Sequence, residues 1–200
     1  MKAWNLISLT EARRLAVEAL AAAPRQTEQV GLRQALGRIA ACDMINAEDN
    51  PAFDRSTVDG YAVRSQDLAA ASAATPVSLR LVGEVRMGRG YDGKISTGEA
   101  VRIPTGGMLP DGADAVLMQE YTAVGVAETV LAGRSVARRE NMVVRGDDVT
   151  AETVVLAAGS KIGVPDLGVL AYCGFARVPV IKKPVVTVVT TGDEMIPPEA

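Results

Sequence analysis

Apolar residues recur at helical spacing in the first part of the chain. Between Ser8 and about Ala23 they fall every three or four positions, which places them on one face of an α-helix. Ser8-Leu9-Thr10-Glu11 has the spacing of an N-terminal capping box, and Pro24 stops a helix. The pattern therefore predicts one amphipathic helix, whose apolar face is made by Leu9, Ala12, Leu15, Ala16, Ala19 and Leu20.

The middle of the chain changes to a strand pattern. Residues 29–45 predict a strand, one helical turn around Gly37-Arg38 and a second strand. From residue 76 to about 144, short β-type runs alternate with glycine-rich turns, at 77–82, 100–103, 115–118, 129–131 and 142–144. Short strands with frequent turns predict a compact β-barrel or sandwich rather than βαβ units.

Helix and strand patterns both return in the last part of the chain. Residues 164–173 predict a short helix with Pro165 at an early position, and residues 177–181 predict a strand. The apolar, β-branched run 185–190 predicts a strand buried on both faces, as in parallel α/β sheets. Because such a strand needs neighbours, we expect the chain to be the front part of a longer protein.

These patterns predict an α+β fold in three parts. Residues 1–50 and 147–183 would form a mixed helix and strand domain, into which a β-rich, barrel-like domain is inserted at 51–146. Residues 184–200 would begin a truncated α/β domain.

Composition narrows the possible chemistry. A net charge of −3 offers no general attraction to nucleic acid or to an anionic membrane, and no run of about 18 apolar residues predicts a membrane span. The chain has no His, which excludes a Cys/His zinc site and a Ser-His-Asp triad. Cys42 and Cys173 lie in apolar stretches and are interpreted as buried free thiols, which suit a cytoplasmic protein.

One motif concentrates polar side chains between residues 51 and 63. Asp59-Gly60 predicts a turn, and Tyr61-Ala62-Val63 predicts the strand that follows it. A carboxylate on a tight turn before a strand has a fixed direction, as a metal ligand or a polar substrate contact requires. Acidic surface turns are also common, so the residues alone leave both interpretations open.

Three further stretches combine turn residues with oxygen-bearing side chains. Thr105-Gly106-Gly107 suits either an anion contact or a hairpin, and it is no P-loop because no Gly-Lys-[Ser/Thr] follows. Arg145-Gly146-Asp147-Asp148 is either part of a site or a solvated turn. Thr191-Gly192-Asp193-Glu194 follows the apolar run, at the strand end where open α/β sheets bind ligands.

The string from Pro51 to Val63 resembles the signature of the molybdopterin molybdenumtransferase family, of the MoeA and gephyrin E-domain type. The segments at 32–39, 105–116, 145–148 and 191–194 are also similar to that family. Two positions depart from its pattern: Gly107 stands where Ala is usual, and Val143 where Arg is usual. The change at Val143 implies that a basic contact to an anionic substrate is either lost or supplied by Arg145 or Arg139.

The resemblance implies a function and a set of site residues. The family inserts molybdate into adenylated molybdopterin, releases AMP and uses Mg²⁺. It implies that residues 184–200 begin the molybdopterin-binding domain and that the mixed domain links and dimerises subunits. The implied catalytic residues are Asp59, Thr105, Asp148 and Glu194, with Glu194 also a metal ligand; the implied substrate-binding residues are Ser56, Gly106, Arg145 and Asp193.

Partners and an alternative follow from the same resemblance. It implies a homodimer and an upstream molybdopterin adenylyltransferase that supplies the substrate. We expect these 200 residues to be inactive on their own, because most of the α/β domain is missing from them. The alternative is a non-catalytic dimerisation or scaffold module of the gephyrin E-domain type.

Overall fold

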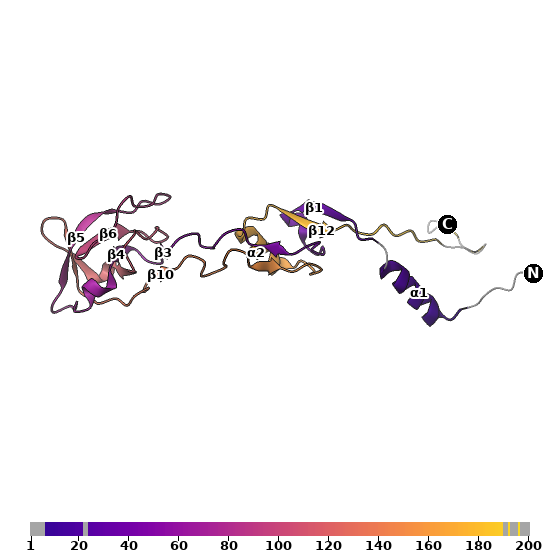
Figure 1. The fold of residues 1–200 in the computed structure, drawn as a ribbon, viewed down its shortest axis with the longest axis horizontal. Helices are drawn as coiled ribbons and strands as arrows, with labels where there is room; N and C mark the ends of the chain where they lie inside the picture. Colours follow the sequence, from indigo (N-terminus) through magenta and orange to yellow (C-terminus); the bar gives the residue numbers. More distant parts are fainter. Residues whose placement is uncertain (1–6, 22–23, 190–191, 193–195, 197–200) are drawn as a thin grey trace, which may run out of the picture. The chain divides into compact units, whose positions relative to one another are not determined.

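The computed structural model describes residues 7–21, 24–189, 192 and 196 (Figure 1). The chain divides into two compact units: residues 45–155, and residues 1–44 together with 156–200. The sequence predicted an inserted domain at residues 51–146, and this domain assignment stays a prediction. The strand-rich α+β character expected from the sequence is confirmed.

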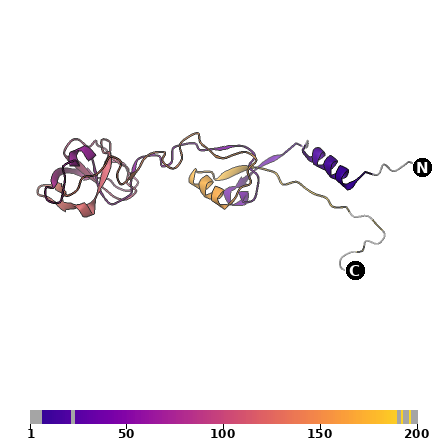
Figure 2. The ribbon, with the colours of Figure 1, turned by 90° about the horizontal axis from the view of Figure 1, so that it is seen from below.

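The unit of residues 1–44 and 156–200, called the outer unit, is built on an antiparallel strand pair. It contains α1 (Leu9–Ala21), β1 (Thr27–Gly31), the 3-10 helix η1 (Leu32–Ala35), α2 (Val164–Tyr172) and β12 (Arg177–Ile181). β1 pairs with β12, and α2 packs against η1; in Figure 2 the orange α2 lies beside the purple residues of η1. The buried side chains of this unit include Ala35, Ala40, Ile162, Leu170, Val178 and Val180.

The helix predicted from the capping box is α1. Its Glu11 backbone N–H donates to the Ser8 hydroxyl at 3.2 Å, as the box requires. The described residues of α1 include no buried side chain, and its apolar positions Leu9 and Leu20 are 87% and 74% exposed. Local capping and periodicity therefore specify this helix without a packed partner among the described residues.

The unit of residues 45–155, called the inserted unit, is dominated by one six-stranded sheet (Figure 1). Its strand order is β7-β4-β6-β5-β9-β8. All neighbouring strands are antiparallel except β5 and β6, which are parallel. The strands are β4 (Gly60–Val63), β5 (Val77–Glu84), β6 (Glu99–Ile103), β7 (Ala115–Met118), β8 (Thr122–Val124) and β9 (Thr129–Ala132). Short 3-10 helices, η2 (Ser65–Leu68) and η3 (Gln119–Tyr121), follow β4 and β7.

Both faces of this sheet are covered. Alternate residues of a strand point to opposite faces, so Val63 of β4 joins one apolar cluster and Ala62 joins the other. The same alternation separates Leu117 from Val116 in β7. Burial on two faces explains why β7 is a continuous apolar run rather than an alternating one.

Two short strand pairs remain among the described residues. β3 (Arg55–Ser56) pairs with β10 (Met142–Val143), and β2 (Met44–Ile45) pairs with β11 (Val154–Leu156). The strand predicted at 142–144 therefore exists as β10, but it lies outside the six-stranded sheet. β2 and β11 lie where the chain passes between the two units.

Residues 184–200 and the two cysteines were each given an expected environment from the sequence. Among the described residues 184–189, 192 and 196 there is no strand, and Val185 and Val188 are 92% and 81% exposed. The start of an α/β domain at 184–200 therefore stays a prediction. The interpretation of both thiols as buried is wrong, because Cys42 lies exposed in a bend and Cys173 is only partly buried.

Candidate functional site

Asp59 and Thr105 meet because of the register between two strands. β4 and β6 are antiparallel, and Gly60 pairs with Ile103, so the residues just outside both strands lie close together. Asp59 precedes Gly60, and Thr105 follows β6 across Pro104. The backbone N–H of Thr105 donates to Asp59 Oδ1 at 2.7 Å, and the Thr105 hydroxyl donates to the same oxygen at 3.0 Å.

Gly60 allows the backbone to approach β7 at this point. A Cβ atom on Gly60 would lie 2.1 Å from the carbonyl oxygen of Leu117, which no side chain tolerates. Gly60 is the first residue of β4 and does not have a positive φ, so the prediction that it acts as a turn glycine is wrong. It sets the distance between β4 and β7, and with it the position of the Asp59 carboxylate.

Hydrogen bonds keep Asp59 ionised. The Thr105 backbone N–H and then the Thr105 hydroxyl lower the pKa of Asp59 below its usual value. Desolvation opposes these two bonds, and the positive charge of Arg102 is the smallest of the four causes. The carboxylate lies at a depression of about 220 Å³. The residues around it are Asp59, Gly60, Glu84, Arg102, Ile103, Pro104 and Gln119.

Sequence reasoning missed Arg102 and Glu84. Arg102 is an exposed charged residue in β6 between the buried Val101 and Ile103, and its Nε lies 4.0 Å from Glu84 Oε1. A lone Arg within an apolar strand, three residues before Thr105, was the available signal. Together they place one positive and one negative side chain beside the Asp59 carboxylate.

Ser56 and Gly106 hold the turn that carries Thr105. The Gly106 N–H donates to the Ser56 carbonyl at 2.8 Å, and the Ser56 N–H donates to the Gly107 carbonyl at 3.0 Å. Gly106 has φ +80°, in the left-handed region that favours glycine. The buried Ser56 hydroxyl donates to the Val58 carbonyl at 2.6 Å, so this hydroxyl is engaged within the chain.

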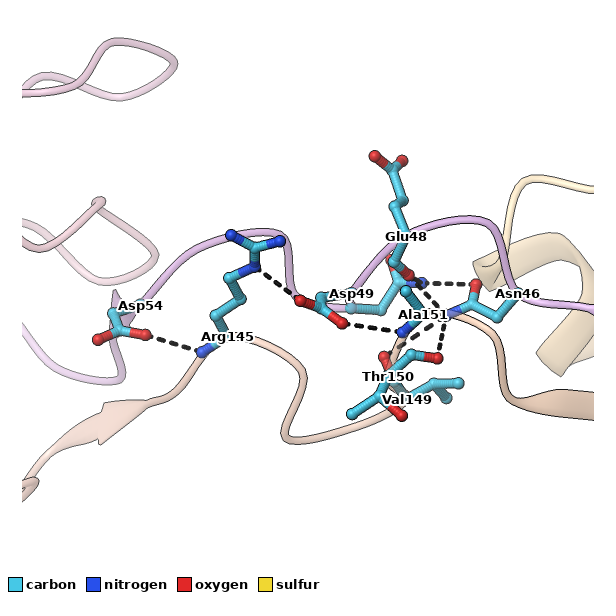
Figure 3. Close-up of polar contacts among 9 residues, drawn as sticks. Asn46, Glu48, Asp49, Asp54, Arg145, Val149, Thr150 and Ala151 are labelled. Atoms are coloured by element: carbon cyan, nitrogen blue, oxygen red, sulfur yellow. Dashed lines mark hydrogen bonds and ion pairs between the residues drawn. The ribbon is translucent and has the colours of Figure 1, made fainter.

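Arg145 is held by two aspartates (Figure 3). Its Nε donates to Asp49 Oδ2 at 2.7 Å, and its backbone N–H donates to Asp54 Oδ1 at 2.8 Å. The other oxygen of Asp49 accepts the Ala151 N–H at 2.8 Å. The pKa of Asp49 is lowered by that Ala151 bond and, to a smaller extent, by Arg145. The terminal nitrogens of the guanidinium point away from Asp49 in Figure 3.

A buried Asn braces the two chain segments beside Arg145. Asn46 is 1% exposed, and its Nδ2 donates to the Glu48 carbonyl at 2.6 Å and to the Thr150 carbonyl at 3.0 Å (Figure 3). Its Oδ1 accepts a hydrogen bond from Asn50 Nδ2 at 3.1 Å. The network fixes the path of residues 46–50 against residues 149–153.

Asp148 lies on the same pair of segments. Its backbone N–H donates to the Asn50 carbonyl at 3.0 Å, and its side chain is exposed. The segment 50–59 therefore contacts all the described site residues predicted from the sequence: Asp148 and Arg145 near its start, then Gly106 and Thr105. Asp193 and Glu194 lie outside the described residues, so their roles stay predictions.

The part of the chain that the structure describes contains no group of three or more His, Cys, Asp or Glu side chains close enough to hold a metal ion. Glu194, the implied Mg²⁺ ligand, lies outside the described residues, so the ion stays a prediction. Within the same part of the chain, no helix has the length and apolar character needed to cross a bilayer.

Comparison with known proteins identifies the family. Residues 7–174 match the family model described as the MoeA N-terminal region, domains I and II. The chain belongs to this family. The resemblance drawn from the motif at 51–63 is therefore confirmed.

Relatives of this MoeA-family chain are longer than the chain itself. It is 37% identical over 167 residues to a molybdopterin molybdenumtransferase of Staphylococcus aureus (strain MSSA476), and 37% identical over 175 residues to one of Bacillus subtilis (strain 168). These alignments cover 84% and 86% of this chain but 40% of each relative. The chain thus spans about two fifths of the length of these relatives.

A solved structure has the same fold. A crystal structure of a molybdopterin biosynthesis MoeA protein from Pyrococcus horikoshii superposes with a TM-score of 0.82 at 36% sequence identity. The similarity covers 94% of this chain and 48% of that one. A second structure of a MoeA protein from Pyrococcus horikoshii OT3 gives a TM-score of 0.73 at 38% identity.

Proposed function

We propose that the protein containing this chain acts in molybdenum cofactor biosynthesis. Its reaction would be insertion of molybdate into adenylated molybdopterin, with release of AMP. The observation that carries the proposal is the family match over residues 7–174, which includes Asp59, Thr105 and Asp148. Relatives of 37% identity that are named molybdopterin molybdenumtransferases support the same reaction.

The geometry around Asp59 suggests separate roles for Asp59, for Thr105 and for the nearby arginines. Both hydrogen bonds from Thr105 end on Oδ1, so Oδ2 is the oxygen proposed to accept a hydrogen bond from a substrate donor group. The Thr105 hydroxyl donates its hydrogen bond to Asp59, so Thr105 is proposed to position Asp59 rather than to donate to an anion. Arg102 and Arg145 are proposed to offset the negative charge of the substrates.

The remaining site residues complete the proposal. Asp148 and Glu194 are proposed as catalytic residues, Glu194 also as the ligand of Mg²⁺, and Ser56, Gly106 and Asp193 as substrate contacts. Ser56 and Gly106 would act through their backbone, since the Ser56 hydroxyl is engaged with Val58. We also propose a cytoplasmic homodimer that receives its substrate from a molybdopterin adenylyltransferase.

The test is turnover by the full-length protein. AMP release and cofactor formation are measured with adenylated molybdopterin, molybdate and Mg²⁺, with EDTA as the metal-free arm. D59N and D148N should lower kcat by about a hundredfold or more, as loss of a positioned catalytic group does. The matched control is D92N, because Asp92 is an exposed Asp in a surface ion pair with Arg89.

The same assay separates the competing interpretations. A full-length protein that dimerises but releases no AMP would overturn the transferase proposal in favour of the scaffold module. These 200 residues alone should release none, because they span about two fifths of the relatives. Activity of the 200-residue chain would contradict that expectation.

A further inference from the structure

Arg55 lies in β3, between the turn that carries Thr105 and the segment that carries Arg145. On one side β3 pairs with β10, where Arg55 lies opposite Val143. On the other side Arg55 forms a bridge with Met108, and the neighbouring backbone groups of Asp54 and Ser56 bond to residues 106–109. The residue is thus fixed between the Thr105 turn and the Arg145 segment.

The side chain of Arg55 points away from the apolar core. Successive residues of a strand point to opposite faces, and the buried Ser56 occupies the inner face beside Met142, which packs on an apolar cluster. Arg55 therefore shares the other face with Val143 and Met108, its directly opposite neighbours. Neither neighbour carries a charge that could neutralise a guanidinium.

The Nε atom of Arg55 is buried and has no hydrogen-bond acceptor among the described residues. Buried donors of charged groups are costly when unpaired, and nearly all of them have partners in folded proteins. The other arginines close to this site do have partners: Arg145 bonds to Asp49, and Arg102 lies near Glu84. An unmatched N–H flanked by apolar side chains is the expected state of a donor whose acceptor arrives with a ligand.

We propose that Arg55 binds a tetrahedral oxyanion through Nε and an adjacent terminal nitrogen. A guanidinium presents two parallel N–H groups on one edge, which match two oxygens of such an anion. Val143 and Met108, which lie opposite Arg55, carry no carboxylate that would compete with the anion for the guanidinium. The inference deepens the proposed function and rests on it, since molybdate and the substrate phosphate groups are the two sources of such an anion.

The experiment uses the 200-residue chain with ¹⁵N-labelled arginine. The Nε–Hε signals are followed by NMR during separate titrations with sodium molybdate, inorganic phosphate, AMP and sodium chloride. We expect one signal, absent in R55K, to shift saturably and exchange more slowly with water in molybdate or in the phosphate compounds. Response to molybdate alone assigns the metal oxyanion, and response to phosphate and AMP assigns the pterin phosphates.

Affinity in variants separates anion binding from a structural role. R55Q should weaken anion binding by about tenfold or more, and R55K, which keeps the charge but lacks Nε, by a smaller factor. R89Q is the control, because Arg89 is 77% exposed and paired only weakly with Asp92, at 3.6 Å; its binding should stay within about twofold. If R55Q does not fold, R55K decides.

Two outcomes overturn the proposal: no signal responds to any oxyanion, or R55Q and R55K bind it as tightly as the parent chain. Failure of the proposed function is seen separately, as absence of AMP release by the full-length protein. Oxyanion binding through Arg55 without transferase activity would leave the inference standing and remove the reaction.

Discussion

One oxygen of Asp59 accepts two hydrogen bonds from a single residue, the backbone N–H and the hydroxyl of Thr105, at 2.7 and 3.0 Å. The pair joins the residue before β4 to the residue that follows β6 and Pro104, across the Gly60–Ile103 register. It keeps the carboxylate ionised, and Asp59 lines a small depression. Measurable consequences follow for titration and for stability.

Replacing Thr105 by Val should raise the pKa of Asp59. The backbone N–H bond stays, but the hydroxyl bond, the second largest cause of the lowered pKa, is lost. The ¹³C chemical shift of the Asp59 carboxyl, followed during an acid titration, measures the change. T122V is the control, since the Thr122 hydroxyl donates to the Gln119 carbonyl and not to a carboxylate. An unchanged Asp59 titration in T105V would show that the hydroxyl bond is absent in solution.

Stability should fall in acid through Asp59 and Asp49. Both have a folded-state pKa below the unfolded value, so each contributes stability that is present above about pH 4, the ordinary pKa of Asp, and lost as pH falls through the folded pKa. Thermal unfolding from pH 7 to pH 2.5 checks this. D49N and D59N should lower Tm at pH 7 and narrow the Tm difference between neutral and acid pH. Equal acid sensitivity of parent and variants would contradict the assignment.

Replacing Asn46 by Ala should destabilise the inserted unit by about 2–3 kcal/mol, because it removes a buried amide that bonds to the Glu48 and Thr150 carbonyls and to the Asn50 amide. Urea unfolding measures the loss. E48A is the matched control: Glu48 contributes its carbonyl to the network while its side chain is exposed, so its effect should stay within about 0.5 kcal/mol. Equal losses in the two variants would show that the network contributes nothing beyond the local chain.

The same substitution should have opposite effects at two glycines. G60A places a Cβ 2.1 Å from the Leu117 carbonyl, so it should cost about 3 kcal/mol or more. G168A lies in α2, where a Cβ has no atom within 4 Å, and it should stabilise by about 0.5–1 kcal/mol because Ala favours a helix. Chemical denaturation of both variants decides; a tolerated G60A would mean that β4 and β7 are farther apart.

Cys42 should react with a thiol reagent much faster than Cys173. Cys42 is exposed, whereas burial raises the pKa of Cys173 and so reduces its thiolate fraction at neutral pH. Mass spectrometry of peptides after brief labelling gives both rates, and C42S and C173S identify the peptides. Faster labelling of Cys173 would contradict the described burial.

Elements specified by local sequence were predictable. The capping box at Ser8 gave α1, and the apolar runs at 100–103 and 115–118 became β6 and β7. The order of strands in the sheet was not predictable from the sequence. The placement of β4 between β7 and β6 depends on contacts between residues far apart in sequence, such as the contact of Gly60 with Leu117. The run at 185–190 has the composition of a buried strand, but its described residues 185–189 are not in a strand, since a strand forms only where a partner supplies hydrogen bonds.

For the site, the motif identified the residues and the structure supplied their relations. A sequence cannot show that Thr105 bonds to Asp59, since that depends on the β4–β6 register. Nor can it show that Arg145 is held by Asp49, a residue 96 positions away. Nor does the motif single out Arg55, because only the fold shows that its buried Nε–H has no acceptor among the described residues.

The pairing of β2 with β11 has a consequence for protein engineering. Residues 44–45 and 154–156 run side by side, so the polypeptide departs from the outer unit and comes back at adjacent points. A segment with neighbouring ends behaves as a cassette, which can be exchanged for a homologous one without stretching the host. Grafting residues 45–155 into a longer relative would therefore transplant Asp59, Thr105 and Arg55 as one preassembled piece.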